Sequence, residues 1–220
     1  MNKIIILTVA ICATVMTASA QELKDSKDSI SYSAGLIVAK NFKAQGIKEV
    51  NPDIVMKAMM DVINGEETMM KPSEAELYLR EYQTKMKGMI AQINKEKGEA
   101  FLAENAKKEG VVALDNGLQY EVIKMGEGAK PKATDKVYTH YHGMLIDGTV
   151  FDSSVERGEP IEFPLNRVIS GWTEILQLMP TGSKWRVYIP SDMAYGPNGA
   201  GGVIGPNETL IFDIELLEIR

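Results

Sequence analysis

The amino-acid sequence predicts an α+β protein in two parts, an all-helical arm followed by an antiparallel β-sheet with one short helix. From residue 24 to about residue 110, apolar residues recur every three or four positions, which is the period of an amphipathic helix. From Leu118 onward they recur every second position, which is the period of a half-buried strand. The change of period therefore marks the change of fold class.

The first twenty residues have the pattern of a secretory signal peptide. Lys3 precedes an apolar run that reaches Met16, and the small residues Ala18-Ser19-Ala20 close it. A membrane-spanning helix needs roughly 20 apolar residues, so this run is too short to be an anchor. We therefore expect residues 1–20 to be cleaved and the mature protein to be exported.

Composition excludes several function classes. Cys12, the only cysteine, lies inside the signal segment, so the mature chain has no thiol for disulfides, thiol catalysis or zinc–thiolate sites. Lipidation of Cys12 is the alternative to plain cleavage, although Ile11 is bulkier than the residue usually found before a lipidated cysteine. The net charge is −6, and the basic residues are interleaved with acidic ones. We therefore expect no nucleic acid partner.

Three helices are expected in the arm, residues 21–113. The first stops at Gln45-Gly46. In the second, Asn51 is the N-cap, Pro52 is the first helical residue and Gly65 is the end. Two short helices contain too little chain to cover their own apolar faces. We therefore expect a second copy of the chain to cover them in a homodimer.

The third helix is expected to be long. Pro72 leads into a capping box formed by Ser73 and Glu76, and helix-favouring sequence continues without proline to Gly110.

Two features of this helix bear on its surroundings. Gly88 and Gly98 lie inside it, and each costs about 1 kcal/mol relative to alanine. Its second half, residues 94–109, keeps only Phe101 and Leu102 as large apolar residues. This composition predicts a solvated stalk that connects two bodies.

The remaining sequence, residues 114–220, is predicted to form short strands around one helix. Asp147-Gly148 is a strong hairpin signal. Only the stretch from Trp172 to Met179 fits a helix, and it is apolar enough to lie under a sheet. The expected strands are Leu118 to Val122, Val137 to Leu145, Thr149 to Ser153, Ile161 to Phe163, Lys184 to Ile189 and Glu208 to Ile219.

Four other patterns are weaker signs of chemistry. His140 and His142 share one face of a strand, but no third metal ligand is evident nearby. Asp152-Ser153-Ser154 lacks the Gly-x-Ser-x-Gly elbow of a hydrolase. The glycine-rich run 196–205 lacks the Lys-Ser/Thr of a phosphate loop, and Asn207-Glu208-Thr209 is a frequent chance match to a glycosylation site. We therefore predict neither a metal nor a cofactor.

Seven segments, in the same order, resemble the successive signatures of FKBP-type peptidyl-prolyl isomerases. They are Tyr141-His142-Gly143-Met144-Leu145, Asp147-Gly148, Phe151-Asp152-Ser153-Ser154, Val168-Ile169, Gly171-Trp172, Ala194-Tyr195-Gly196 and Leu210-Ile211-Phe212-Asp213. The resemblance covers residues 114–220. The arm is similar to the amino-terminal dimerisation domain of periplasmic and surface members of the macrophage infectivity potentiator kind. The resemblance implies a sheet wrapped around a short helix, a ligand pocket between them, and a location in the periplasm or on the outer cell surface.

The resemblance also implies the site residues. The expected catalytic residues are Asp152, Tyr195 and Ile169: the Ile169 N–H and the Tyr195 hydroxyl bind substrate carbonyls, and Asp152 lies near the twisting amide. The expected substrate-binding residues are Tyr141, Phe151, Arg157, Val168, Trp172 and Phe212. Ile161 stands where many relatives carry an aromatic wall residue. The loop near Ala200 lacks the larger ring of some relatives, which weakens contact with macrolides.

The implied function is cis–trans isomerisation of X-Pro bonds, which assists the folding of exported proteins. An apolar pocket would desolvate and orient the amide. The implied partners are unfolded or proline-containing polypeptides, with macrolides as inhibitors. Two alternatives stay open. A holding chaperone would use the methionine-rich arm to grip unfolded chains, and a binding module would keep the pocket with little turnover.

Overall fold

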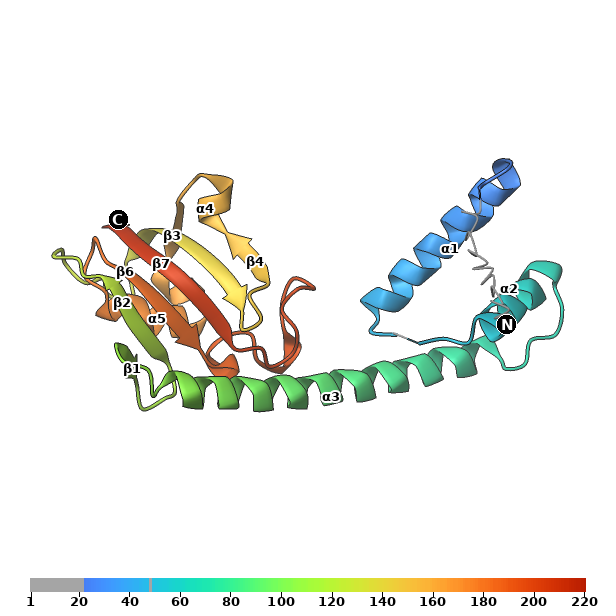
Figure 1. Ribbon diagram of the computed structural model, residues 1–220, viewed down its shortest axis with the longest axis horizontal. Coiled ribbons are helices and arrows are strands. Elements are labelled where there is room, and N and C mark those ends of the chain that lie inside the picture. Colours follow the sequence, from blue (N-terminus) through green and yellow to red (C-terminus); the bar gives the residue numbers. More distant parts are fainter. Residues whose placement is uncertain (1–21, 48) are drawn as a thin grey trace, which may run out of the picture. The chain divides into compact units, whose positions relative to one another are not determined.

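The computed structural model describes residues 22–47 and 49–220 (Figure 1). The predicted signal peptide, residues 1–20, lies outside the described residues. The chain divides into two units, residues 1–48 and residues 49–220, and helix α1 belongs to the first. None of the helices in residues 22–47 and 49–220 combines the length and the apolar composition of a membrane span.

Helices α1 (Ser26–Ala44) and α2 (Pro52–Asn64) begin and end at residues suited to helix termini. The Asp25 carboxylate caps α1. The Asn51 side chain caps α2 as predicted, and Gly65 ends it in the left-handed conformation. The two predicted short helices are therefore present.

Helix α3 (Pro72–Asn105) is one continuous helix, as predicted, although it ends at Asn105 rather than near Gly110. The predicted capping box of Ser73 and Glu76 is wrong, because the Glu74 carboxylate instead accepts the N–H of Lys71 at 3.1 Å. Proline suits the first helical position, where its missing N–H needs no partner. The cap therefore falls on the residue before the proline.

The second half of α3 does not form the solvated stalk that its composition predicts. Its last turns pack against the sheet domain, where Gly98 and Asn105 are buried (Figure 1). Asn105 Nδ2 donates to Gln119 Oε1 at 3.0 Å, and Gln119 Nε2 donates to the Leu102 carbonyl at 2.9 Å. Because small and polar side chains make much of this contact, the apolar pattern of the α3 sequence does not reveal that the helix packs against the sheet domain.

The sheet domain holds a seven-stranded antiparallel sheet in the described chain, in the order β1-β2-β6-β7-β3-β4, with β5 paired to β3. Its strands are β1 (Val111–Ala113), β2 (Gln119–Lys124), β3 (Lys136–Leu145), β4 (Val150–Ser153), β5 (Ile161–Pro164), β6 (Lys184–Ile189) and β7 (Leu210–Ile219). The period of two predicts each of them except β1. Because β1 pairs with β2, the sheet begins just before residue 114, and the predicted domain boundary there remains a prediction.

Helix α5 (Ser170–Leu178) packs on one face of the sheet. It corresponds to the helix predicted from Trp172 to Met179. Trp172, Ile175 and Leu176 are buried in one core cluster with residues of β3, β6 and β7. At Gly171 a Cβ atom would lie 2.5 Å from Ile189 Cγ2, so glycine allows α5 to approach β6. The short connecting helices are α4 (Ser154–Arg157), η1 (Leu165–Arg167), η2 (Ser191–Met193) and η3 (Gly196–Asn198).

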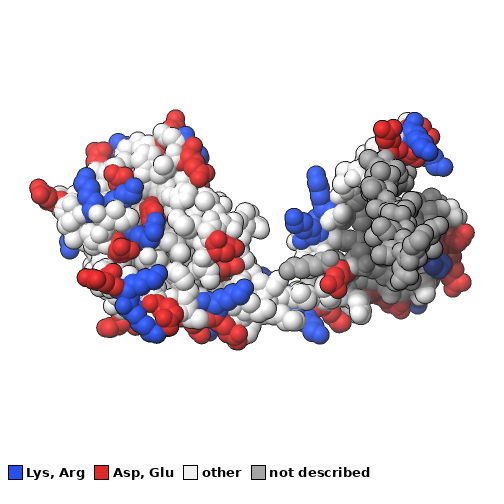
Figure 2. Space-filling view, in the orientation of Figure 1, with Lys and Arg blue, Asp and Glu red and all other residues white. Residues whose placement is uncertain are grey.

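The outer surface of the sheet domain carries both signs of charge. On the face drawn in Figure 2, Lys and Arg side chains alternate with Asp and Glu side chains over this domain. Such interleaving gives no extended field of one sign on that face.

The two glycines inside α3 should respond oppositely to alanine. A Cβ at Gly98 would lie 2.3 Å from Thr209 Oγ1, and Thr209 is only 3% exposed and cannot swing away. We expect Gly98→Ala to lower the free energy of unfolding by ~1–3 kcal/mol through overpacking. Gly88 has nothing within 4 Å, so Gly88→Ala should raise it by up to ~1 kcal/mol. Urea unfolding of both variants measures the difference, and equal effects would contradict the docking of α3.

Candidate active site

A cavity of about 690 Å³ opens between α5, the sheet and the adjoining loops. Its lining brings together every predicted site residue except Arg157. These residues are Tyr141, Phe151, Asp152, Val168, Ile169, Trp172, Tyr195 and Phe212. Residues from β3, β4, α5, β7 and two loops thus converge on one hollow.

Trp172 forms the floor of the cavity and is 5% exposed. Its ring centroid lies 5.3 Å from that of Tyr141 and 5.1 Å from that of Phe212, with interplanar angles of 83° and 82°. Phe163 packs against the indole at 5.3 Å. Edge-to-face contacts of this kind contribute beyond the area they bury. The rings fix one another's orientation, so the floor is preformed.

Gly143 makes room for two of the aromatic walls. It follows Tyr141 by two positions on β3, so both face the same side of the sheet. A Cβ at Gly143 would lie 2.7 Å from the Phe151 ring and 2.8 Å from the Phe212 ring. Glycine at this position therefore lets both rings approach the strand. The sequence motif contains Gly143 but does not reveal this packing role.

A hydrogen-bonded network fixes the rim of the cavity. Tyr141 Oη donates to Asp152 Oδ2 at 2.5 Å, and Arg157 Nη2 donates to Tyr141 Oη at 2.9 Å. Arg157 also forms an ion pair with Asp152. Strand β4 supplies Asp152 and the short helix α4 supplies Arg157. Arg157 therefore orients residues of the cavity without lining it.

The same network sets the protonation of the rim. Burial raises the pKa of the Asp152 carboxyl, but hydrogen bonds from Tyr141 and Arg157 outweigh it, so the pKa lies below its ordinary value. Burial, and then the hydrogen bond to Asp152, raise the pKa of Tyr141. Burial, and then the charge of Asp152, raise the pKa of Tyr195. At neutral pH the rim offers a carboxylate and two neutral hydroxyls, so these three groups are not poised to exchange protons.

Ile169 and Tyr195 present hydrogen-bond donors to the cavity. Ile169 precedes α5, and its carbonyl accepts the N–H of Trp172 at 3.0 Å. The Ile169 N–H donates to no other group in the described part of the chain. Tyr195 is 41% exposed, and its hydroxyl has no hydrogen bond to another described residue. Both donors are therefore free to bind a ligand.

The histidines and serines of the weaker motifs bind each other. His140 Nδ1 lies 3.1 Å from Ser154 Oγ, and His142 Nδ1 lies 2.9 Å from Ser153 Oγ. Ser154 Oγ also accepts the N–H of Tyr141 at 2.8 Å. Among residues 22–47 and 49–220 no three His, Cys, Asp or Glu side chains form a metal-binding group. Ser153 thus connects the end of β4 to β3, and Ser154 connects α4 to β3.

The cavity also has walls that the motifs do not indicate. They are Phe163, Arg167, Gly201, Val203 and Ile204. Ile161 and Ala200, the two positions where the sequence is expected to depart from the family pattern, line the cavity as well. Phe163 is an aromatic residue on a predicted strand, which is a usable signal. The loop residues follow no apolar period, so the sequence pattern does not assign them.

Comparisons with known proteins agree over nearly the whole described chain. Residues 127–217 match the family FKBP-type peptidyl-prolyl cis-trans isomerase, and residues 27–122 match the family described as the domain amino terminal to it. The chain is 45% identical to "Outer membrane protein MIP" of Legionella longbeachae, over 98% of this chain and 95% of the relative. It is 46% identical to the "FKBP-type 22 kDa peptidyl-prolyl cis-trans isomerase" of Escherichia coli, over 86% of this chain and 93% of the relative. The crystal structure of FkpA from Escherichia coli superposes with a TM-score of 0.71 at 33% identity, covering 90% of this chain and 99% of that one.

The rim network predicts how Asp152 titrates. We expect Arg157→Gln to raise the pKa of the Asp152 carboxyl toward its ordinary value of ~3.9, because the variant removes the ion pair. Arg167→Gln is the matched control, since Arg167 lines the cavity without a hydrogen bond to Asp152. Carbon-13 NMR of the Asp152 carboxyl measures its pKa in both variants. Identical titration in wild type and Arg157→Gln would show that the network does not set this charge.

A stability measurement checks the sign of the same shift. A carboxyl whose pKa is lowered by folding adds stability above its ordinary value, and the contribution is lost as the pH falls through the lowered value. Wild type should therefore lose more of its urea resistance below about pH 4 than Arg157→Gln does.

Proposed function

Because the chain belongs to the FKBP-type peptidyl-prolyl cis-trans isomerase family, it is a peptidyl-prolyl isomerase, and we propose that the cavity above Trp172 is its active site. One observation carries the proposal: a preformed aromatic hollow is combined with two free donors, the Ile169 N–H and the Tyr195 hydroxyl. Rotation about an X-Pro bond needs only the loss of amide resonance, across a barrier of about 18–20 kcal/mol. A site without a nucleophile suits that reaction.

The apolar walls lower this barrier because they destabilise the planar state of the amide more than the twisted state. A planar amide is more charge-separated than a twisted one, so water stabilises the planar form more. Between Phe151, Trp172 and Phe212 that hydration is lost. The planar ground state is therefore disfavoured relative to the twisted transition state.

Polar groups at the rim orient the substrate. The Ile169 N–H and the Tyr195 hydroxyl bind the carbonyls that flank the proline, and the Asp152 carboxylate lies near the twisting amide. Since Tyr141 and Arg157 hold that carboxylate in place, its position costs little reorganisation during the reaction. Shortening an isomerisation from tens of seconds to milliseconds is roughly 10⁴-fold, or about 5.5 kcal/mol. Desolvation and orientation together can supply this amount.

The proposed substrates are proline-containing stretches of unfolded exported proteins, and the proposed location is the periplasm or the outer cell surface. The signal-peptide pattern of residues 1–20 and the printed name of the Legionella relative support export. The proposed folding role follows from this location. We also propose that macrolides bind the cavity, with weaker contact at the small side chain of Ala200.

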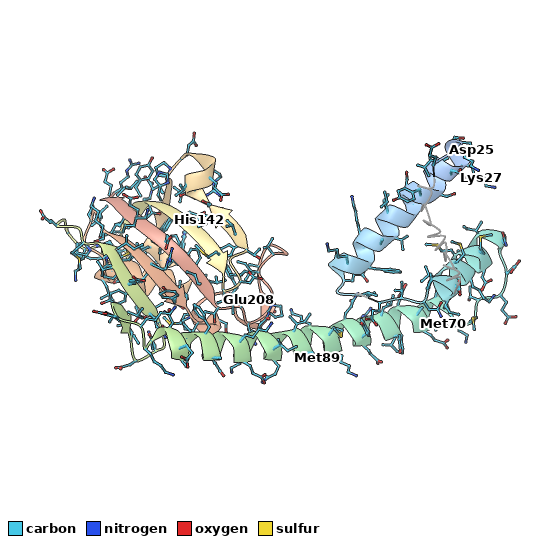
Figure 3. All side chains as sticks on the ribbon, in the orientation of Figure 1. Asp25, Lys27, Met70, Met89, His142 and Glu208 are labelled. Atoms are coloured by element: carbon cyan, nitrogen blue, oxygen red, sulfur yellow. The ribbon has the colours of Figure 1, made fainter. Side chains whose placement is uncertain are left out.

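A holding chaperone is the second candidate function, because the arm exposes several methionines (Figure 3). They are Met56, Met60, Met69, Met70 and Met89. Thioether side chains adapt to irregular apolar partners. Suppression of aggregation by the arm alone, with a client whose folding is not limited by proline, would favour this function over isomerisation.

Substitutions at the rim and at the floor should have different consequences. We expect Asp152→Ala and Tyr195→Phe to lower turnover of a short Xaa-Pro peptide without unfolding, because both side chains are partly exposed and act by hydrogen bonding. Trp172→Ala should also cost ~3–5 kcal/mol of stability, since it removes a buried aromatic ring. Tyr138→Phe, outside the cavity, is the control. A Tyr195→Phe variant with wild-type turnover would remove that hydroxyl from the mechanism.

The arm is proposed to hold two copies of the chain together through residues 24–93. Large apolar side chains on all three arm helices are exposed in the single chain. They include Ile30, Ile37, Ile54, Val62, Ile63, Leu77 and Tyr78. An apolar surface of this extent is unfavourable in water, and an identical copy can cover it symmetrically.

Sedimentation tests this assembly directly. We expect the mature protein to be a dimer at micromolar concentration. Ile63→Glu should shift it toward monomer, because Ile63 is 74% exposed in the single chain and a charge there opposes an apolar interface. Lys87→Glu, at a position that is already polar, is the control for added negative charge. A monomeric wild-type protein would refute the proposed interface.

A further inference from the structure

The loop between η3 and β7, residues 199–209, lies between the cavity and helix α3. Its inner side supplies the cavity walls Ala200, Gly201, Val203 and Ile204. Its tip is closed by reciprocal hydrogen bonds between Ala200 and Ile204, at 2.9 and 3.0 Å. Its base is closed by the Asn207 N–H, which donates to the Gly196 carbonyl at 2.8 Å. Hydrogen bonds within the chain therefore close the loop at its tip and at its base.

The outer side of this loop is hydrogen-bonded to α3. Asn94 Nδ2 donates to the Pro206 carbonyl at 2.9 Å, and Asn207 Nδ2 donates to the Ala91 carbonyl at 3.3 Å. We call these two bonds the latch. Figure 3 shows Glu208 where the loop meets α3.

Side chains pack closely around the latch. A Cβ at Gly205 would lie 3.2 Å from Asn94 Nδ2 and 3.3 Å from Glu208 Oε1. On the helix, Gly98 lacks the Cβ that would collide with Thr209. The loop and the helix are thus fitted to each other on both sides of the contact.

Asn207 meets two requirements at once. Its φ angle is 55°, and among the described residues other than glycine no other has a positive φ. Asparagine tolerates this left-handed conformation better than most residues. The turn brings the chain back toward α3, and the side-chain amide then reaches the helix. This double use, rather than glycosylation, accounts for the Asn207-Glu208-Thr209 motif.

We propose that Asn94 and Asn207 are positioning residues for substrate binding, and that through them α3 sets the shape of the active-site wall. The loop contains Gly199, Gly201, Gly202 and Gly205, so its own backbone supplies little rigidity. An external anchor near Pro206 therefore decides where Val203 and Ile204 stand. The inference rests on the proposed assignment of the cavity as the active site.

The test uses the full-length mature protein with Asn94→Ala and Asn207→Gly. Alanine favours the helix, so Asn94→Ala removes the bond without weakening α3. Glycine keeps the positive φ, so Asn207→Gly removes the other bond without backbone strain. Gln92→Ala is the matched control, because Gln92 is exposed on the same helix and bonds only Glu96.

We expect each latch variant to raise KM for a short Xaa-Pro peptide by about three- to tenfold, the range of one hydrogen bond. The value of kcat should stay within about twofold, because the floor and the rim are untouched. Hydrogen exchange of the Ala200 and Ile204 amides should accelerate by a similar factor, whereas amides of β3 and β7 should not change. Gln92→Ala should match wild type in every measurement.

Two results would overturn the proposal. One is unchanged KM together with unchanged loop exchange in both variants. The other is faster exchange in β3 and β7 as well, because that would mean general destabilisation rather than a moved wall. Failure of the active-site assignment is recognised separately, by wild-type turnover in both Tyr195→Phe and Asp152→Ala. In that event the exchange measurement still decides whether the latch holds the loop.

Discussion

The indole of Trp172 packs edge-to-face against Tyr141 and Phe212, and this contact joins α5 to strands β3 and β7. The hydrophobic core of the sheet domain depends on this contact, because the residues that follow Trp172 on α5 are buried in that core. The cavity depends on it because the exposed side of the same aromatic group is the floor. Glycine at positions 143 and 171 permits the approach of rings and backbone that the contact requires. One packing arrangement thus supplies both stability and the floor of the proposed active site.

The chemistry of the family suits such a site, since isomerisation of an X-Pro bond transfers neither a proton nor a group. Catalysis then needs an apolar environment and fixed dipoles rather than a titrating side chain. The rim meets this requirement because Tyr141 and Arg157 keep Asp152 as a carboxylate, while burial keeps the tyrosine hydroxyls neutral. A group held in one protonation state and one orientation can stabilise charge but cannot act as an acid and a base in turn.

Most helices and strands of the fold could be predicted from the sequence, because two physical signals are strong. The change of apolar period separates arm from sheet, and alternation along β3 and β7 identifies strands with one buried face. The docking of α3 could not be predicted, since Asn94, Gly98 and Asn105 carry no apolar pattern. In the candidate site, aromatic residues were separable from ordinary core only through the family resemblance. The resemblance did not indicate Val203 and Ile204, because they lie in a loop without an apolar period.

The docking of α3 also changes what the arm contributes to the enzyme. A flexible linker would leave each active site free to orient independently, whereas one helix from Pro72 to Asn105 joins the apolar arm surface to the sheet domain without an interruption. In the proposed dimer, the separation of two cavities would then be set by helices rather than by a random chain. A long unfolded client that reaches both cavities gains effective concentration at the second, while a short peptide gains nothing. In the proposed dimer, the arm would therefore favour large clients without any change in the chemistry of a single cavity.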